Sequence, residues 1–227
     1  MRTIFVGDVH GCADELDALL VKVGFTSTDR LMLTGDMFDR GEKPLGVLKL
    51  IRLTNAEAVI GNHEDKLLRA LAFKPGKGKK RPRLTAPYAD CLKKIAPERE
   101  AFFAYLKSLP MTISEGRNGQ AWTLLHAGID LKKGLLATNP AFFLYARTHP
   151  PMDVPGAPEW FKCYDGKDGL LISGHVPLEK PFRAVRKGKP VAVAVDTGCC
   201  FGRELTAYIL EEDRFVSVRA RKVYYRP

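Results

Sequence analysis

The sequence contains nine polar side chains that suit metal or phosphate binding, most of them just after a short apolar run. They are Asp8, His10, Asp36, Asp39, Arg40, Asn62, His63, His126 and His175. Carboxylate and imidazole groups in one place suit Mn, Fe, Zn or Ni. Asp8 and His10 are two residues apart, so in an extended segment they point to the same side. One such pair is a weak signal, but several such groups at the ends of apolar runs predict a metal centre.

Helix capping is the competing interpretation of these side chains. Asp8, Asp36 and Asn62 each precede a predicted helix, and Asp and Asn are favoured caps. Capping alone does not explain why four of the five histidines also follow predicted strands. We therefore expect a metal centre.

Three strand-loop-helix units are predicted in the first third of the chain. Apolar segments at 3–6, 31–33 and 58–60 predict short strands, and helical spacing of apolar residues follows over 14–23, 45–53 and 64–73. This alternation is typical of an α/β fold with largely parallel strands. Ligands of such sheets gather at the carboxyl ends of the strands, so we expect the polar loops to meet there.

The rest of the chain does not repeat the strand-loop-helix pattern. Helices are predicted over 88–94 and 99–109, and a hairpin is predicted with strands at 111–114 and 121–125 around Arg117-Asn118-Gly119. Residues 134–168 are irregular, with a short helix expected at 141–145. Further strands, mostly antiparallel, are predicted at 170–173, 191–196, 205–210 and 215–218. No linker divides the chain, so we expect a single domain over residues 1–227.

The charge and the cysteines limit the class of protein. The net charge of +10 favours polyanionic or phosphorylated partners, and residues 74–83 carry a basic run. That run is typical of a solvated loop, with weak nucleic-acid contact as the alternative. Five cysteines without a CxxC pair indicate neither a disulfide framework nor a zinc knuckle, which favours a reducing cytoplasm. No apolar run is long enough to span a membrane, so no membrane partner is expected.

The motifs resemble those of calcineurin-like metallophosphoesterases, and in particular the phosphoprotein phosphatase branch. The segments that carry the resemblance are GDVHG at 7–11, GDMFDRG at 35–41, GNHE at 61–64, His126 in LLHAGI, His175 in SGHVP and the closing DTG at 196–198. The resemblance covers essentially the whole chain. It implies an α/β fold, specifically a four-layer α/β/β/α sandwich with mixed sheets.

The resemblance also implies a role for each residue. Asp8 and His10 would bind a first divalent ion, Asp36 would bridge the two ions, and Asn62, His126 and His175 would bind the second. Mn is the expected metal, with Fe, Zn or Ni as alternatives. A hydroxide bridging the ions would attack phosphorus, His63 would protonate the leaving group, and Asp39 would hold His63. Arg40, Arg147 and Asn62 would bind the substrate phosphate.

The substrate is left open between several classes. A serine/threonine protein phosphatase is the first expectation. The alternatives are a bis(5'-nucleosyl)-tetraphosphatase, whose second motif usually lacks the Asp retained here as Asp39, and an RNA-end phosphatase acting on 2'- or 2',3'-cyclic phosphates. The C-terminal segment resembles the phosphatase module of bacterial polynucleotide kinase-phosphatases, although no kinase P-loop is present. An inactive polyanion-binding module is the non-enzymatic alternative.

Several other residues have two interpretations. Glu64 is either a first-turn acid favoured by the helix dipole, which we prefer, or a support for the site. Asp196 is expected to support a metal histidine or the backbone. The aromatic residues of segment 135–167 either stack on a substrate base or form a small core, which we prefer. Cys12 and the pair Cys199-Cys200 are expected to be packed thiols.

Overall fold

The N-terminal units form the centre of the first sheet. The computed structural model describes residues 1–73, 84–117, 120–149 and 152–226. The units run through β1 (Thr3–Val6), α1 (Ala13–Lys22), β2 (Arg30–Leu33), α2 (Pro44–Thr54), β3 (Glu57–Ala58) and α3 (Asn62–Ala72). Strand β2 pairs in parallel with both β1 and β3, as the alternating pattern predicts.

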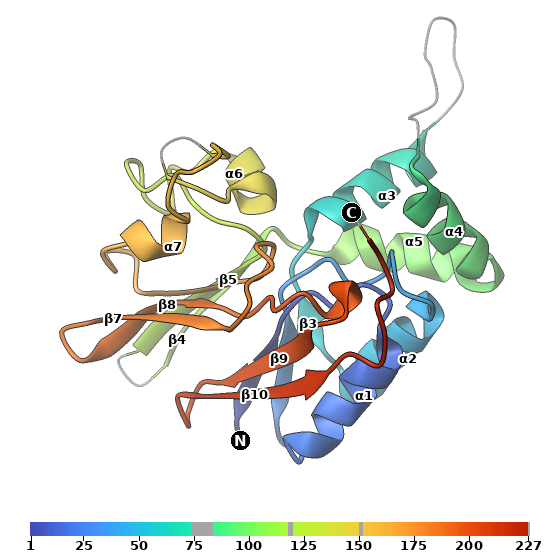
Figure 1. The fold of residues 1–227 in the computed structure, drawn as a ribbon, viewed down its shortest axis with the longest axis horizontal. Helices are drawn as coiled ribbons and strands as arrows, with labels where there is room; N and C mark the ends of the chain where they lie inside the picture. Colours follow the sequence, from blue (N-terminus) through green and yellow to red (C-terminus); the bar gives the residue numbers. More distant parts are fainter. Residues whose placement is uncertain (74–83, 118–119, 150–151, 227) are drawn as a thin grey trace, which may run out of the picture.

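Two five-stranded mixed sheets make up the middle of the molecule (Figure 1). The first has the order β10-β9-β1-β2-β3, with β9 (Glu204–Ile209) and β10 (Arg214–Arg219) antiparallel to their neighbours. The second has the order β4-β5-β6-β8-β7. Its strands are β4 (Thr112–Arg117), β5 (Gln120–Leu125), β6 (Leu170–Ser173), β7 (Phe182–Arg186) and β8 (Lys189–Ala194). Phe5 and Met32 of the first sheet pack in one core with Trp122 and Ile172 of the second, which shows that the sheets lie face to face.

Helices cover the outer faces of both sheets. A large core joins the first sheet to α1, α2, α4 (Ala86–Lys94) and α5 (Arg99–Ser108), with a short 3-10 turn (Ala96–Glu98) between α4 and α5. A second core places α7 (Trp160–Cys163) against the other sheet, and α6 (Pro140–Tyr145) lies on the same side (Figure 1). The four layers confirm the predicted α/β/β/α sandwich with mixed sheets.

Some elements differ from the prediction. Strand β3 covers residues 57–58 rather than 58–60, because the amide of Ile60 donates to the carbonyl of Pro110 instead of extending the ladder. Strand β8 is parallel to β6, although the C-terminal strands are expected to be mostly antiparallel. Strand β7 is not predicted at all: it is an edge strand whose exposed arginines obscure the apolar alternation. Asn118 and Gly119 of the predicted turn lie outside the described residues, but β4 and β5 pair antiparallel as expected.

No helix in the described residues is both long enough and apolar enough to cross a membrane.

Candidate metal centre

The predicted ligands lie together in two groups that share Asp36. One group is Asp8, His10 and Asp36, and the other is Asp36, His126 and His175; within each group the candidate ligand atoms lie within 4.8 Å of one another. All five side chains are buried. Residues from β1 to the end of β6 therefore meet at the carboxyl ends of the central strands of both sheets.

Asp36 presents one oxygen to both groups. Its Oδ1 accepts the backbone N–H of His63 at 3.0 Å. Its Oδ2 lies 3.7 Å from Nε2 of His10 and 3.5 Å from Nε2 of His126. Burial opposes the charged carboxylate, but the neighbouring histidines outweigh it and hold the pKa of Asp36 below its ordinary value. Oδ2 of Asp36 therefore faces both ligand groups, so one carboxylate oxygen makes both contacts.

The second group has the donor chemistry that a cation requires. Nδ1 of His126 donates to the carbonyl of Thr34 at 2.8 Å, which leaves Nε2 of the neutral ring with a lone pair. That Nε2 lies 3.0 Å from Oδ1 of Asn62 and 3.1 Å from Nδ1 of His175. Three acceptor-type atoms thus meet with few protons to share between them. A divalent ion with N and O ligands fits this set.

Glycines allow the ligand loops to approach each other. A Cβ on Gly61 would lie 2.2 Å from Oδ1 of Asp36, and one on Gly174 would lie 2.1 Å from Oδ1 of Asp8. Any side chain at these positions would displace a carboxylate of the centre. The amide of His175 donates to both oxygens of Asp8 at 3.2 Å. These contacts tie the loop after β1 to the loop after β6.

Four of the site residues adopt left-handed backbone conformations. His10, Asp36, Arg40 and His175 have φ angles of 46°, 50°, 68° and 68°. Residues other than glycine adopt this region at a cost, and such strain concentrates at functional sites. The loops are thus shaped to aim these side chains inward.

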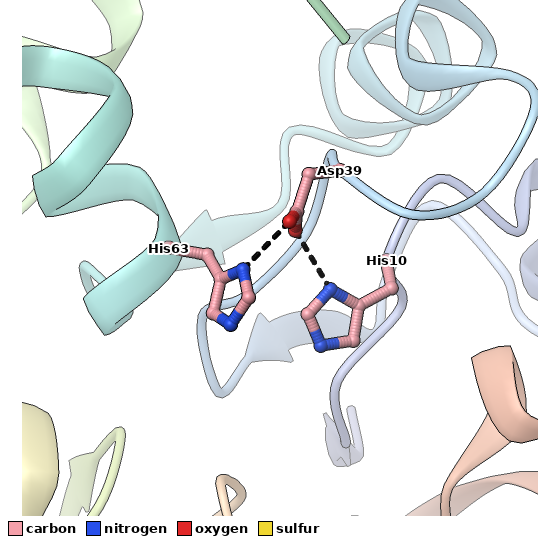
Figure 2. Close-up of side chains that lie close together, drawn as sticks. All are labelled: His10, Asp39 and His63. Atoms are coloured by element: carbon pink, nitrogen blue, oxygen red, sulfur yellow. Dashed lines mark hydrogen bonds and ion pairs between the residues drawn. The ribbon is translucent and has the colours of Figure 1, made fainter. Parts of the chain in front are cut away.

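Asp39 holds two histidines at once (Figure 2). Its Oδ1 lies 2.9 Å from Nδ1 of His10, and its Oδ2 lies 2.7 Å from Nδ1 of His63. The resemblance implies only the second contact. Both rings are thereby oriented with Nε2 toward Asp36. Burial lowers the pKa of His63, but Asp36 and Asp39 outweigh it and raise that pKa above its ordinary value.

Two arginines flank the shared carboxylate. Arg40 donates from Nη1 to Nε2 of His10 at 2.8 Å, and its Nη2 lies 3.2 Å from Nε2 of His63. On the other side, Nε of Arg147 lies 3.3 Å from Nε2 of His175. The structure therefore places Arg147, whose motif match is loose, at the same centre. Both line a hollow of about 50 Å³ together with Asp8, Asn62 and Asp196. A larger hollow of about 420 Å³ contains none of these ligands.

Aromatic residues to which the sequence assigns no role support Arg40 and His63. The Cζ atom of Arg40 lies 5.3 Å from the ring centroid of Phe201 and 5.0 Å from that of Tyr225, in cation–π range. Tyr88 stacks on His63 at 5.3 Å between centroids, and its hydroxyl lies 2.9 Å from Nδ1. These contacts join segments that lie far apart in the sequence, so only the three-dimensional structure reveals them.

Glu64 is a first-turn acid of α3, as preferred from sequence, and it also supports the site. The side chain is fully buried. Its Oε2 accepts the amides of Asp36 at 2.7 Å and Gly61 at 3.1 Å, and its Oε1 accepts the amide of Met37 at 2.8 Å. Burial is the main cause that raises the pKa of Glu64, to about 8. The carboxyl group thus joins the second and third ligand loops.

Three further predictions concern Asp196, the aromatic residues of segment 135–167 and the basic run at 74–83. Asp196 supports the backbone as expected, because its Oδ1 accepts the amide of Gly198 at 2.9 Å. Trp160, Phe161 and Tyr164 are buried in the core beneath the second sheet, which confirms the core interpretation for these aromatic residues. The basic run at 74–83 lies outside the described residues, so its nucleic-acid contact stays a prediction.

Similarities to known proteins agree with this geometry. The profile of the family "Calcineurin-like phosphoesterase" matches residues 1–218. A bis(5'-nucleosyl)-tetraphosphatase PrpE [asymmetrical] from Oceanobacillus iheyensis is 31% identical, over 99% of this chain and 94% of that protein. A bis(5'-nucleosyl)-tetraphosphatase, symmetrical, from Salmonella paratyphi C is 37% identical, over 95% of this chain and 93% of that protein.

A solved structure shows the same fold. The structure of a putative diadenosine tetraphosphatase aligns with a TM-score of 0.74 at 23% identity, over 96% of this chain and 93% of that one. The family match, the shared fold and the paired ligand groups lead to one conclusion: the chain belongs to the calcineurin-like phosphoesterase family and is a metal-dependent phosphoesterase.

Proposed function

We propose that this chain hydrolyses bis(5'-nucleosyl) tetraphosphates at a centre of two divalent ions. The proposal for the chemistry rests on one observation above all, the single Asp36 oxygen that both ligand groups share. The proposal for the substrate rests on relatives of nearly full length whose names are those of tetraphosphatases. The first expectation from sequence, a serine/threonine protein phosphatase, has weaker support than this alternative.

The proposed ligand assignment follows the two groups. Asp8, His10 and Asp36 would hold one ion, and Asp36, Asn62, His126 and His175 would hold the other. Manganese is the expected metal, with iron, zinc or nickel as alternatives. When bound, such a pair neutralises phosphate oxygens and lowers the pKa of water toward neutrality.

The protein's own groups supply orientation and a proton. His63 would donate from Nε2 to the leaving oxygen, because Asp39 holds its Nδ1 and turns Nε2 toward the centre. Arg40 and Arg147 would each bind phosphate oxygens from opposite sides of the hollow. A chain of four phosphates presents enough oxygens to engage both guanidinium groups and the amide of Asn62.

The presence of Asp39 is compatible with a tetraphosphate substrate. From sequence, Asp39 favours the protein-phosphatase form, since its role there is to hold the acid His63. The structure gives Asp39 a second contact, to Nδ1 of the proposed metal ligand His10. That contact serves metal binding whatever the substrate. A phosphate leaving group is also less basic than a serine alkoxide, so it makes smaller demands on the acid.

The substrate is tested by parallel turnover. The full chain with Mn²⁺ is assayed on diadenosine tetraphosphate, a phosphoserine peptide and RNA ending in a 2',3'-cyclic phosphate, with Asp36→Asn as the inactive control. We expect the highest kcat/KM for the tetraphosphate. Chromatography then separates asymmetrical cleavage, which gives ATP and AMP, from symmetrical cleavage, which gives ADP alone. A higher kcat/KM for the phosphopeptide or the RNA would overturn the substrate proposal while leaving the metal chemistry standing.

Metal removal separates the enzyme from an inactive binding module. Chelation should abolish turnover, and Mn²⁺ should restore it. Absence of turnover on every substrate with Mn²⁺, Fe²⁺, Zn²⁺ and Ni²⁺ would favour the polyanion-binding alternative.

All five cysteines are free thiols, which supports the proposed location in a reducing cytoplasm.

A further inference from the structure

A second cluster of metal-binding groups lies beside the catalytic centre and shares none of its residues. It consists of Cys12 at the start of α1, Glu15 one turn later and Cys199 in the 3-10 helix Cys199–Phe201. We propose that Cys12, Glu15 and Cys199 bind a structural Zn²⁺ that is separate from the proposed catalytic pair.

The three donors are close together and shielded from solvent. The two Sγ atoms and a carboxylate oxygen of Glu15 lie within 4.8 Å of one another. Each of the three residues is 1% exposed. A carboxylate and two thiols from two separate segments thus lie close together, away from bulk water.

Glu15 has one oxygen that lacks a partner. Its Oε1 accepts the amide of Arg221 at 2.9 Å and the hydroxyl of Tyr224 at 2.6 Å. Its Oε2 is buried and has no hydrogen-bond partner among the described residues. A buried charged oxygen without a partner is costly, and most are paired or bound to a cation. A bound ion would satisfy this oxygen.

A small hollow adjoins two of the three donors. It has a volume of about 10 Å³ and is lined by residues that include Cys12, Glu15 and Tyr224, but not Cys199. That volume is close to the roughly 10–15 Å³ that one water molecule needs.

The donor types select zinc and distinguish this cluster from the catalytic one. Two thiolates with one carboxylate suit a tetrahedral Zn²⁺, whereas the catalytic groups offer only nitrogen and oxygen. On binding, each thiol releases its proton to solvent and forms a Zn–S bond, with no change of oxidation state. The ion would tie α1 to the 3-10 helix and, through Glu15, to the C-terminal segment that carries Tyr225.

Cobalt substitution tests the proposal without relying on activity. The full chain is produced with Co²⁺ in place of zinc, and thiolate-to-cobalt charge-transfer absorption is recorded in the near ultraviolet. We expect this band in the unmodified protein, because two of the three proposed donors are thiolates. The catalytic donors contain no sulfur, so cobalt bound there would give no such band. Cys12→Ser and Cys199→Ser should lose the band and one bound ion per chain. Cys91→Ser should keep both, since Cys91 is equally buried but contacts the carbonyl of Phe38 elsewhere.

Stability gives a second measurement. Added Zn²⁺ should raise the midpoint of thermal unfolding by more in the unmodified protein and in Cys91→Ser than in Cys12→Ser or Glu15→Gln. The proposal is overturned if the unmodified cobalt protein shows no thiolate band, or if the band persists in the Cys12→Ser, Cys199→Ser double variant. It is also overturned if Cys12 and Cys199 prove to be joined in a disulfide.

Discussion

Replacing Asp39 with asparagine should damage metal binding or proton transfer, because only one of its two histidine contacts can be kept. Asp39→Asn keeps the size of the side chain but exchanges one carboxylate oxygen for an NH₂ group. Asp39 accepts from Nδ1 of His10 with one oxygen and from Nδ1 of His63 with the other. Asparagine has one acceptor oxygen, so its NH₂ group must face one of the two N–H groups, donor against donor.

The magnitude follows from which histidine loses its partner. Asp39 is buried, so water does not replace the lost acceptor. If His10 loses it, metal affinity should fall about 10–100-fold, as for other carboxylate partners of metal-binding histidines. If His63 loses it, the loss of an oriented acid should cost about 100-fold or more in rate. Either loss lowers turnover in the same assay, so we expect kcat/KM to fall at least about 10-fold at low Mn²⁺.

The assay is turnover of the preferred substrate across a series of Mn²⁺ concentrations. Saturating Mn²⁺ should restore activity if His10 has lost its acceptor and should not restore it if His63 has. Asp213→Asn is the control, since Asp213 is an exposed carboxylate that pairs with Arg183 away from the centre. Activity within a few-fold of the unmodified enzyme at every Mn²⁺ concentration would refute the double role of Asp39.

Three further variants test other parts of the site. Glu64→Ala leaves three buried amides without an acceptor, so the free energy of unfolding measured with urea should fall by about 3 kcal/mol or more; an unchanged value would contradict the support role. His63→Ala should reduce turnover strongly for an alkyl phosphate and less for nitrophenyl phosphate, whose leaving group needs less protonation; equal losses would count against an acid role. Tyr225→Leu removes one of the two rings against Arg40, so KM should rise several-fold while Tyr225→Phe restores it; an unchanged KM in Tyr225→Leu would show that the ring does not position Arg40.

Each loop that carries a predicted ligand has a local signal in the sequence. Gly61 and Gly174 precede predicted ligands, and the structure shows that each gives a neighbouring carboxylate the space it needs. Parallel strands then bring Asp8 and Asp36 to one edge of the first sheet, and His126 and His175 to one edge of the second. The fold class and the gathering of these residues were thus accessible from motif and strand pattern alone.

Contacts between distant segments were not accessible in the same way. The double contact of Asp39 depends on the relative placement of two loops, and the pattern names only one of its histidines. Glu64 is a first-turn acid of α3, which the sequence signals, and it also accepts the amides of Asp36 and Met37, which the sequence does not signal. Tyr225 lies far along the chain from Arg40, and the C-terminal resemblance gives it no contact with Arg40. Side-chain direction, which periodicity does not determine inside loops, decides each of these cases.

We propose that one oxygen of Asp36 is shared by two cations. Anomalous diffraction from crystals of the full chain grown with Mn²⁺ tests it most directly. We expect two anomalous peaks about 3.5–4 Å apart, one beside Asp8 and His10, the other beside His126 and His175, with Asp36 between them. A single peak, or peaks that lie away from Asp36, would contradict the binuclear centre.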